Sequence, residues 1–490
     1  MRMLYLDLDT LRPDHLSCYG YHRNTSPTID RICSEGMRFD NFYCTDAPCL
    51  PGRAAMMSGQ FGIHNGVINH GGACADRLPD GKDRGFSDYL RAGGYTNIMR
   101  RAGLRTAYIG GFGERHSAYW YYAGFREIID TGLLGHESAE HVTPSVLDWI
   151  GRNGSSDNWY LHVNYWDPHT PYRAPAEFGN PFENEPLPDW MTDEQLERDW
   201  LKAGPHSAQD FGMYNNKTNP NQPRQPGEVR GRDGFRQAID GYDCGIRYMD
   251  GHIGRIFDAL EAQGVLDDLV VIVSSDHGEN LGELGIYGEH GTADQITCRI
   301  PMIIRWPGRI KKGAVAKGIH GTIDLCPTLA EMLGVSPHPK WDGVSFAGTL
   351  SSDSDSGRSD LVLSQNCHVC QRSVRWGDWL YIRTYHDGYH LFPKEQVFNI
   401  KTDPHEQFDI AQVQPELVKE GAWRLMNWHD EMMATMPDGR MVDPMRIVLN
   451  EGGPFHARGH LKSYIKRLED TGRGHAIEEL RRRHPREFAS

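Results

Sequence analysis

The sequence lacks any apolar run long enough to cross a bilayer, so a membrane partner is not expected. It has no excess of basic residues: the net charge is -14, which argues against a nucleic-acid partner. It also lacks the features of a cleaved leader, because the short apolar run of residues 1–9 is interrupted by aspartates. A cytoplasmic protein is therefore expected, or a periplasmic or secreted one if a leader has been removed.

The ten cysteines lack the pattern of a disulfide framework or of a zinc site. They are scattered through a long chain, whereas disulfide frameworks are typical of short secreted proteins. Cys367 and Cys370 form a single C-x-x-C pair, and no second pair of zinc ligands lies at a suitable spacing. Free thiols are therefore expected.

Apolar segments alternate with amphipathic ones along the first two thirds of the chain. Short apolar runs predict buried strands, and the patterns between them predict helices. The predicted strands are 3–8, 105–110, 159–165 and 269–275, and the clearest predicted helices are 27–36, 143–151 and 235–263. This alternation predicts an α/β fold in which a large, mostly parallel sheet is flanked by helices.

The length of 490 residues exceeds what one hydrophobic core usually holds, so more than one domain is expected. We predict a catalytic α/β domain over residues 1–350 and a turn-rich linker over 351–358. A smaller antiparallel sheet follows in an α+β subdomain over 359–439, and a C-terminal extension covers 440–490. The predicted elements of the subdomain are strands at 361–364, 372–375, 379–384 and 389–392 and a helix at 415–434.

Residues 173–232 interrupt the α/β pattern. They are rich in Pro, Asn, Gly and Gln, with a short acidic helical piece near 192–202. Long irregular segments in compact domains are usually functional or mobile. We interpret this insertion as a lid or rim over the site, with a solvated excursion as the alternative.

Several reactive side chains end a predicted strand or start a turn. Asp9 ends the first strand, Asp276 and His277 end the strongest one, and Cys49 begins a turn that leads into a predicted helix at 53–59. Sites in open α/β sheets lie at the carboxyl ends of strands, so these side chains are expected to meet. Two carboxylates suit a hard divalent cation, to which His277 could add a nitrogen. A helix N-terminus favours an anion at Cys49, and Arg53 lies on the same helical face.

The order of these motifs resembles that of the formylglycine-dependent sulfatases of the alkaline phosphatase superfamily. The segment Cys49-Leu50-Pro51-Gly52-Arg53 matches the family's C-x-P-x-R motif, which is highly specific in this context. Four further segments resemble family motifs in the same order, namely residues 8–14, 166–172, 275–279 and 299–308. The resemblance covers about the first 345 residues and implies an alkaline-phosphatase-like fold.

The resemblance also implies a mechanism and a set of site residues. Cys49 is expected to be oxidised to formylglycine by a separate formylglycine-generating enzyme, and the hydrated aldehyde is expected to attack sulfur. Asp9, Asp276, His277 and the modified Cys49 would hold a divalent metal, with calcium as the first choice and manganese as the alternative. His169 of the D-P-H-x-P-Y segment is the expected acid for the leaving alcohol. The implied substrate is a sulfate monoester on a small molecule or an oligosaccharide.

Two departures from the family pattern concern the metal. Thr10 stands where many sulfatases carry a second aspartate, and His277 stands where many carry asparagine. Asp7 lies on the same strand face as Asp9, so it could replace the lost ligand or support the site from behind. The related phosphonate monoester hydrolases share both departures, which strengthens that family as the alternative.

Two further departures concern the substrate anion. His290 stands where a lysine is usual, and Gly111 stands where the other lysine would be. We expect His290 to bind the substrate anion, and Arg115 or His116 to fill the gap left at Gly111. A histidine titrates near neutrality, so its presence predicts substrate affinity with a more acidic optimum.

Three functions therefore remain in view. The first is a sulfatase acting on a sulfated sugar or polysaccharide fragment. The second is a phosphonate monoester or phosphodiester hydrolase with the same nucleophile. The third is a catalytically inert binding protein on a sulfatase scaffold, against which the intact Cys49, Arg53, Asp9 and Asp276 argue. The sequence leaves the oligomeric state open.

Overall fold

The computed structural model describes residues 1–77, 93–351, 355, 357–437 and 441–488. The predicted linker at 351–358 lies partly outside these residues. Among the described residues, no helix has the length and apolar character needed to span a membrane. All ten cysteines are free thiols.

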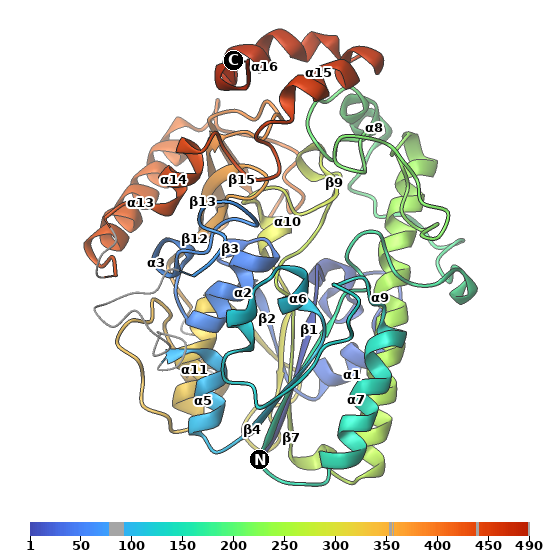
Figure 1. The fold of residues 1–490 in the computed structure, drawn as a ribbon, viewed down its shortest axis with the longest axis vertical. Helices are drawn as coiled ribbons and strands as arrows, with labels where there is room; N and C mark the ends of the chain where they lie inside the picture. The colour runs from blue at the N-terminus through green and yellow to red at the C-terminus, as the bar shows by residue number, and fades with distance from the viewer. Residues whose placement is uncertain (78–92, 352–354, 356, 438–440, 489–490) are drawn as a thin grey trace.

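A large mixed sheet forms the centre of the molecule (Figure 1). Its strands, in spatial order, are β11 (Ala314–Gly321), β2 (Met37–Tyr43), β10 (Met302–Arg305), β7 (Leu269–Ser274), β1 (Arg2–Leu8), β6 (Trp159–Tyr165), β4 (Arg105–Ile109) and β5 (Glu127–Ile129). The five strands from β7 to β5 are mutually parallel, and β10 runs against its neighbours. The predicted α/β fold with a mostly parallel sheet is confirmed.

Helices cover both faces of this sheet, which explains why the side chains of its central strands are buried on both faces rather than alternately buried and exposed. On one face lie α1 (Pro27–Ser34), α7 (Ala139–Asn153) and α9 (Gly231–Ala262), and on the other lie α2 (Cys49–Ser58), α5 (Tyr95–Arg101) and α11 (Leu325–Met332). Each face has its own large cluster of buried apolar side chains. Packing on both faces therefore holds the sheet rigid, and its strand ends give the loops that follow them fixed starting positions.

A second, smaller sheet lies beyond the carboxyl ends of the central strands. Its order is β15 (Glu395–Asn399), β14 (Trp379–His386), β13 (Cys370–Trp376), β12 (Asp360–Gln365) and β3 (Asp46–Ala47), with α13 (Pro415–Ala434) packed against it. The predicted strand at 389–392 is wrong, because Tyr389 and Leu391 have left-handed backbones with φ of 75° and 58° and cannot extend a strand. Strand β3 joins this sheet just before Cys49, so the small sheet extends to the place where Cys49 lies.

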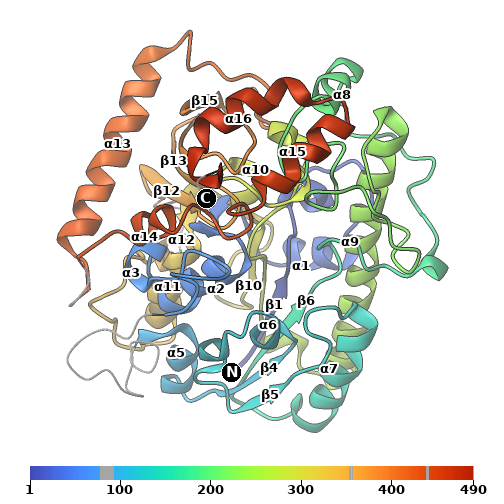
Figure 2. The same ribbon diagram turned by 45° about the horizontal axis from the view of Figure 1, so that its top comes forward.

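The insertion at 173–232 contains α8 (Asp193–Trp200), as predicted, together with a short 3-10 helix at Ala176–Phe178 and the start of α9, and the rest of it is irregular. It is tied to the C-terminal extension, whose helices are α14 (Pro444–Asn450), α15 (Leu461–Asp470) and α16 (Ile477–Arg483) (Figure 2). Arg473 forms a fully buried ion pair of 2.7 Å with Asp210, and the Tyr464 hydroxyl lies 3.0 Å from the same carboxylate. The extension thus anchors the insertion above the sheet.

Candidate active site

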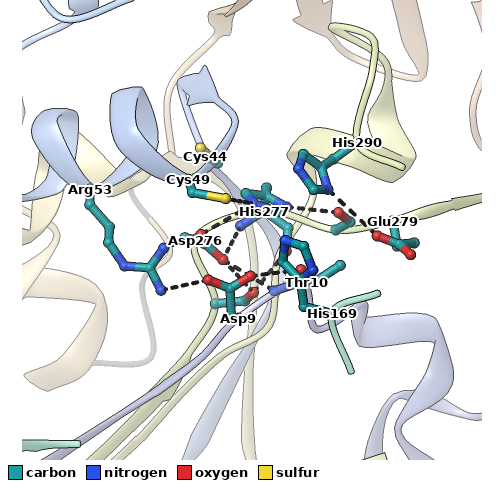
Figure 3. A network of polar contacts seen from close by, with 12 residues as sticks. Asp9, Thr10, Cys44, Cys49, Arg53, His169, Asp276, His277, Glu279 and His290 are labelled. Carbon is teal, nitrogen blue, oxygen red and sulfur yellow. Dashed lines mark hydrogen bonds and ion pairs between the residues drawn. The ribbon is translucent and has the colours of Figure 1, made fainter. Parts of the chain in front are cut away.

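The side chains singled out from the sequence converge at the carboxyl edge of the large sheet (Figure 3). Strand β1 lies between β6 and β7 in parallel register, with Asp7 opposite Asn164 on one side and Ser274 on the other. Asp9 follows β1 and Asp276 follows β7, so the two carboxylates lie close together at the same edge of the sheet. The loops after β4 and β6 add histidines to this edge.

Cys49 occupies the N-terminus of α2, and its side chain is buried. The helix begins at Cys49 itself rather than at residue 53 as predicted, because Pro51 is compatible with the first helical turn. The Cys49 sulfur lies 3.0 Å from Nε2 of His277. Burial by itself raises the pKa of a thiol, but His277, with contacts from His116 and His169, holds the pKa of Cys49 well below its ordinary value. The residue is therefore poised as an anion.

Arg53 joins three buried carboxylates. Its guanidinium makes two contacts with Asp7, of 3.0 and 3.1 Å, and forms further ion pairs with Asp9 at 3.0 Å and with Asp276. The guanidinium also lies 4.3 Å from the centre of the Phe112 ring. Arg53 therefore neutralises the carboxylates that lie beside Cys49, and Asp7 fixes the guanidinium by its two contacts.

Four ligand atoms converge near Cys49, contributed by Asp9, Cys49, Asp276 and His277, all within 4.8 Å of one another. Burial and the nearby Asp276 raise the pKa of Asp9, whereas Arg53 offsets the effect of burial and keeps the pKa of Asp276 low. A divalent cation would relieve this repulsion between carboxylates, so the residues present fit such an ion. Asp7 is not part of this group.

Thr10 takes a supporting place beside the two carboxylates. Its hydroxyl donates a hydrogen bond of 2.7 Å to Asp9, and its backbone N–H donates one of 3.2 Å to Asp276. Thr10 also has a left-handed backbone, with φ of 65°, a strained conformation for a β-branched residue. Thr10, which stands where many sulfatases carry a second aspartate, therefore orients Asp9 and Asp276.

His169 reaches the site from the loop after β6. Its Nδ1 lies 2.6 Å from the carbonyl oxygen of Thr170, so Nδ1 carries a proton and Nε2 remains for other partners. His169 also lowers the pKa of Cys49, and its ring centre lies 5.4 Å from that of His290. Asp167 does not hold His169 but accepts a 2.9 Å hydrogen bond from the N–H of Ala139 at the start of α7.

His290 lies against the ring of His277, with 3.9 Å between ring centres. Its Nε2 is 2.8 Å from Glu289, and its Nδ1 is 3.5 Å from Glu279. Burial opposes a charge on this ring, but Glu289, together with Cys49 and Glu279, raises the pKa of His290 well above its ordinary value. The direction of this shift opposes the expected acidic optimum, because it favours the protonated ring.

The two residues proposed to fill the gap at Gly111 lie in different places. His116, at the end of α6 (Phe112–Arg115), contacts Cys49, whereas Arg115 packs 5.1 Å from the ring centre of Trp166. A side chain at Gly111 would collide with Glu137, whose carboxylate oxygen lies 2.4 Å from an added Cβ. The buried Glu137 therefore takes the space that a longer residue would need.

The sequence reasoning missed residues that surround His290 and Cys49. Glu289 pairs with His290 and also with His206 of the insertion, at 3.0 Å. Burial lowers the pKa of His70, in the loop after α3 (Gly62–Asn65), to about 3, and the nearby Cys49 opposes this shift. The only signals in the sequence were the 24 histidines and the position of Glu289 next to His290.

Comparison with known proteins places these features in context. The family model described as Sulfatase matches residues 3–335. The choline-sulfatase of Rhizobium meliloti (strain 1021) is 25% identical over 439 residues, covering 79% of this chain and 78% of its own. A structure of a protein in complex with its substrate D-glucosamine-2-N,6-O-disulfate aligns with a TM-score of 0.70 at 19% identity, over 90% of this chain and 99% of the other. The phosphonate monoester hydrolase of Agrobacterium radiobacter aligns with a TM-score of 0.68 at 17% identity, over 88% and 95%.

Proposed function

The chain belongs to the sulfatase family of the alkaline phosphatase superfamily and is a sulfuric ester hydrolase, and from that premise we propose its substrate and its catalytic groups. It hydrolyses sulfate monoesters of a sugar or polysaccharide fragment, through a formylglycine at position 49 and a divalent metal. The convergence of Cys49, Asp9, Asp276 and His277 at the N-terminus of α2 carries this proposal. The fold shared with a protein whose substrate is a disulfated glucosamine supports the sugar assignment.

Each residue of the site then has a task. When bound, the metal would supply positive charge to the nucleophile and to the sulfate oxygens. Arg53 holds Asp9 and Asp276 in place, and the helix N-terminus favours the negative charge at position 49. The imidazolium of His290 binds a sulfate oxygen, which replaces the role of the family lysine. His169, with its Nδ1 fixed by Thr170, protonates the leaving alcohol from Nε2.

The mass of residue 49 provides the direct test. The tryptic peptide from Phe39 to Arg53 is measured after expression with and without a formylglycine-generating enzyme. Formylglycine at position 49 that appears with the modifying enzyme is the expected result. A thiol that persists in its presence would overturn the proposed nucleophile and favour an inert binding protein.

A second candidate function is phosphonate monoester hydrolysis, favoured by the donor set of Asp9, Asp276 and His277 with Thr10 beside them. The fold is also shared with a phosphonate monoester hydrolase. The two functions are separated by kcat/KM on an aryl sulfate and an aryl phosphonate monoester that carry the same leaving group. A higher kcat/KM for the aryl sulfate is expected, and a higher kcat/KM for the aryl phosphonate would favour the second candidate function.

The donor set also predicts which metal supports activity. His277 adds nitrogen to two carboxylates, and the transition-metal ion Mn²⁺ accepts one nitrogen ligand more readily than Ca²⁺, which is bound by oxygen ligands. After removal of metal with a chelator, Mn²⁺ is expected to restore more activity than Ca²⁺, and His277→Asn is expected to narrow or reverse this preference. Activity is measured across a titration of each metal, with bound metal counted by mass spectrometry. Equal restoration of the unaltered enzyme by both metals would contradict this assignment.

Substitution of His290 tests the anion-binding role. His290→Gln removes a positive charge from the site, so KM for the sulfate ester is expected to rise about 10- to 100-fold, as for loss of a charge-assisted hydrogen bond. His290→Lys restores the charge and should recover most of the affinity. Because the pKa of His290 is raised, the affinity of the unaltered enzyme should stay level from mildly acidic to neutral pH and weaken only at higher pH. A KM that is unchanged in His290→Gln would remove His290 from this role.

A further inference from the structure

Three histidines from distant parts of the chain meet beside the site, outside the group formed by Asp9, Asp276 and His277. His70 comes from the loop after α3, His368 from the turn between β12 and β13, and His456 from the segment between α14 and α15. One ring nitrogen of each lies within 4.8 Å of the others. His368 is buried, and the other two are half-buried.

The backbone holds the three segments together. The N–H of His456 donates a 3.0 Å hydrogen bond to the carbonyl of Cys367, the residue before His368. The Cys367 thiol in turn donates to the carbonyl of Ile68, two residues before His70, at 3.5 Å. Cys367 thus links all three loops, and the histidines approach one another through a built arrangement rather than by chance contact of mobile side chains.

The rings themselves are closely placed. Nδ1 of His70 lies 3.0 Å from Nε2 of His456, and the rings of His368 and His456 stack with 4.3 Å between centres. The hydrogen bond between His70 and His456 explains the approach of these two rings, but it does not explain why His368 lies beside them. Three imidazoles with converging nitrogens are a common arrangement around a transition metal. Binding would require the two stacked rings to turn toward the shared ion.

A carboxylate stands behind the cluster. Oε1 of Glu289 lies 3.7 Å from Nε2 of His368, and the same residue pairs with His290 and His206. Histidines that bind metals usually have such a carboxylate near their second ring nitrogen, where it orients the ring and strengthens the ligand. Glu289 lies close to His368 and would partly balance the charge of an ion.

We propose that His70, His368 and His456 form a second cation site, which takes a borderline divalent ion such as Zn²⁺ through imidazole nitrogens. Three nitrogen ligands suit zinc and leave a fourth position open, whereas Ca²⁺ requires oxygen ligands that this cluster does not supply. The ring centre of His368 lies 5.9 Å from that of His290, and a ring nitrogen of His290 lies within 4.8 Å of the Cys49 sulfur, so the ion would lie near Cys49. Its open position would be available to an anionic or hydroxyl group of a bound molecule.

Zinc stoichiometry tests the proposal independently of turnover. The full chain is prepared as Cys49→Ala, so that no thiolate at position 49 can hold zinc, and is freed of metal with a chelator. Zn²⁺ is then added, and bound metal is counted by mass spectrometry and by calorimetry. Two equivalents are expected, of which Asp9→Asn removes one and His456→Gln removes the other. The affinity of the second equivalent should fall more than about 100-fold in His456→Gln, beyond the effect of losing only a supporting carboxylate.

His484→Gln is the matched control, because His484 belongs to a separate group with His386 and Asp387 in which Asp387 is already paired with Arg483 and His484. It should retain both equivalents. If His456→Gln does not fold, His70→Gln gives the same test at a half-buried position. A single equivalent in the parent chain, or two that survive both His456→Gln and His70→Gln, would overturn the second site.

Discussion

Replacement of Cys49 by alanine is expected to reduce turnover by at least about 10⁴-fold, a loss typical of removing a covalent nucleophile. The proposed modification oxidises Cβ of Cys49 to an aldehyde and removes the sulfur, and this side chain lies where the helix N-terminus, His277 and the carboxylates converge. The substitution removes one atom from the first turn of α2 and leaves its helical backbone unchanged. Activity should therefore be lost without loss of the fold.

The measurement is kcat on an aryl sulfate, with protein expressed alongside the modifying enzyme and with thermal unfolding followed in parallel. Cys44→Ala is the matched control, because Cys44 is also buried beside α2 but donates its thiol to the carbonyl of Asp46. That variant should keep its turnover. Activity of Cys49→Ala within about tenfold of the parent would place the nucleophile elsewhere, since removal of a true nucleophile costs far more.

Arg53→Gln is expected to damage stability as well as activity. It leaves Asp7, Asp9 and Asp276 buried without their common counter-charge, a change that costs roughly 3–5 kcal/mol when one partner of a buried ion pair is removed. A bound divalent cation would supply part of the missing charge. The loss of stability should therefore be larger in chelator than with Mn²⁺.

The pH dependence of this loss has a defined sign. In the unaltered chain the pKa of Asp276 is held low, so Asp276 stabilises the fold above its unfolded pKa, and that stability is lost as the pH falls through the folded pKa. The difference between Arg53→Gln and the parent should therefore shrink in acid. Denaturant unfolding at several pH values measures it, with Arg53→Lys as the variant that keeps charge but loses the two-point contact with Asp7. A difference that grows in acid would contradict this account.

The parts of the site that could be predicted are those written in short segments. Asp9 and Asp276 follow strands that are buried on both faces, and Cys49 lies in a five-residue motif. Their meeting follows from the parallel order of β1 and β7. Local sequence pattern and the rule that sites lie at the carboxyl ends of parallel strands were therefore sufficient to predict that Cys49, Asp9, Asp276 and His277 meet.

Contacts between distant segments could not be predicted in this way. Glu289 meets His206 and His368, which are separated from it by scores of residues, and nothing in a single sequence pairs them. The pKa shift of His290 depends on Cys49 and Glu279 as well as on the adjacent Glu289, and only the fold brings these groups together. The false strand at 389–392 failed for a related reason, because its pattern does not reveal the left-handed residues that turn the chain.

The burial of Cys49 has a consequence for the maturation of the protein. Only 2% of this residue is exposed, within a regular helix, and histidines from residues 70, 116, 277 and 290 surround it. In the proposed function a separate enzyme must reach this side chain, which the folded molecule covers. We therefore expect the proposed oxidation of Cys49 to compete with folding, so that a chain that folds first keeps its thiol. Conditions that slow folding or raise the level of the modifying enzyme should increase the fraction of active molecules, independently of the total yield.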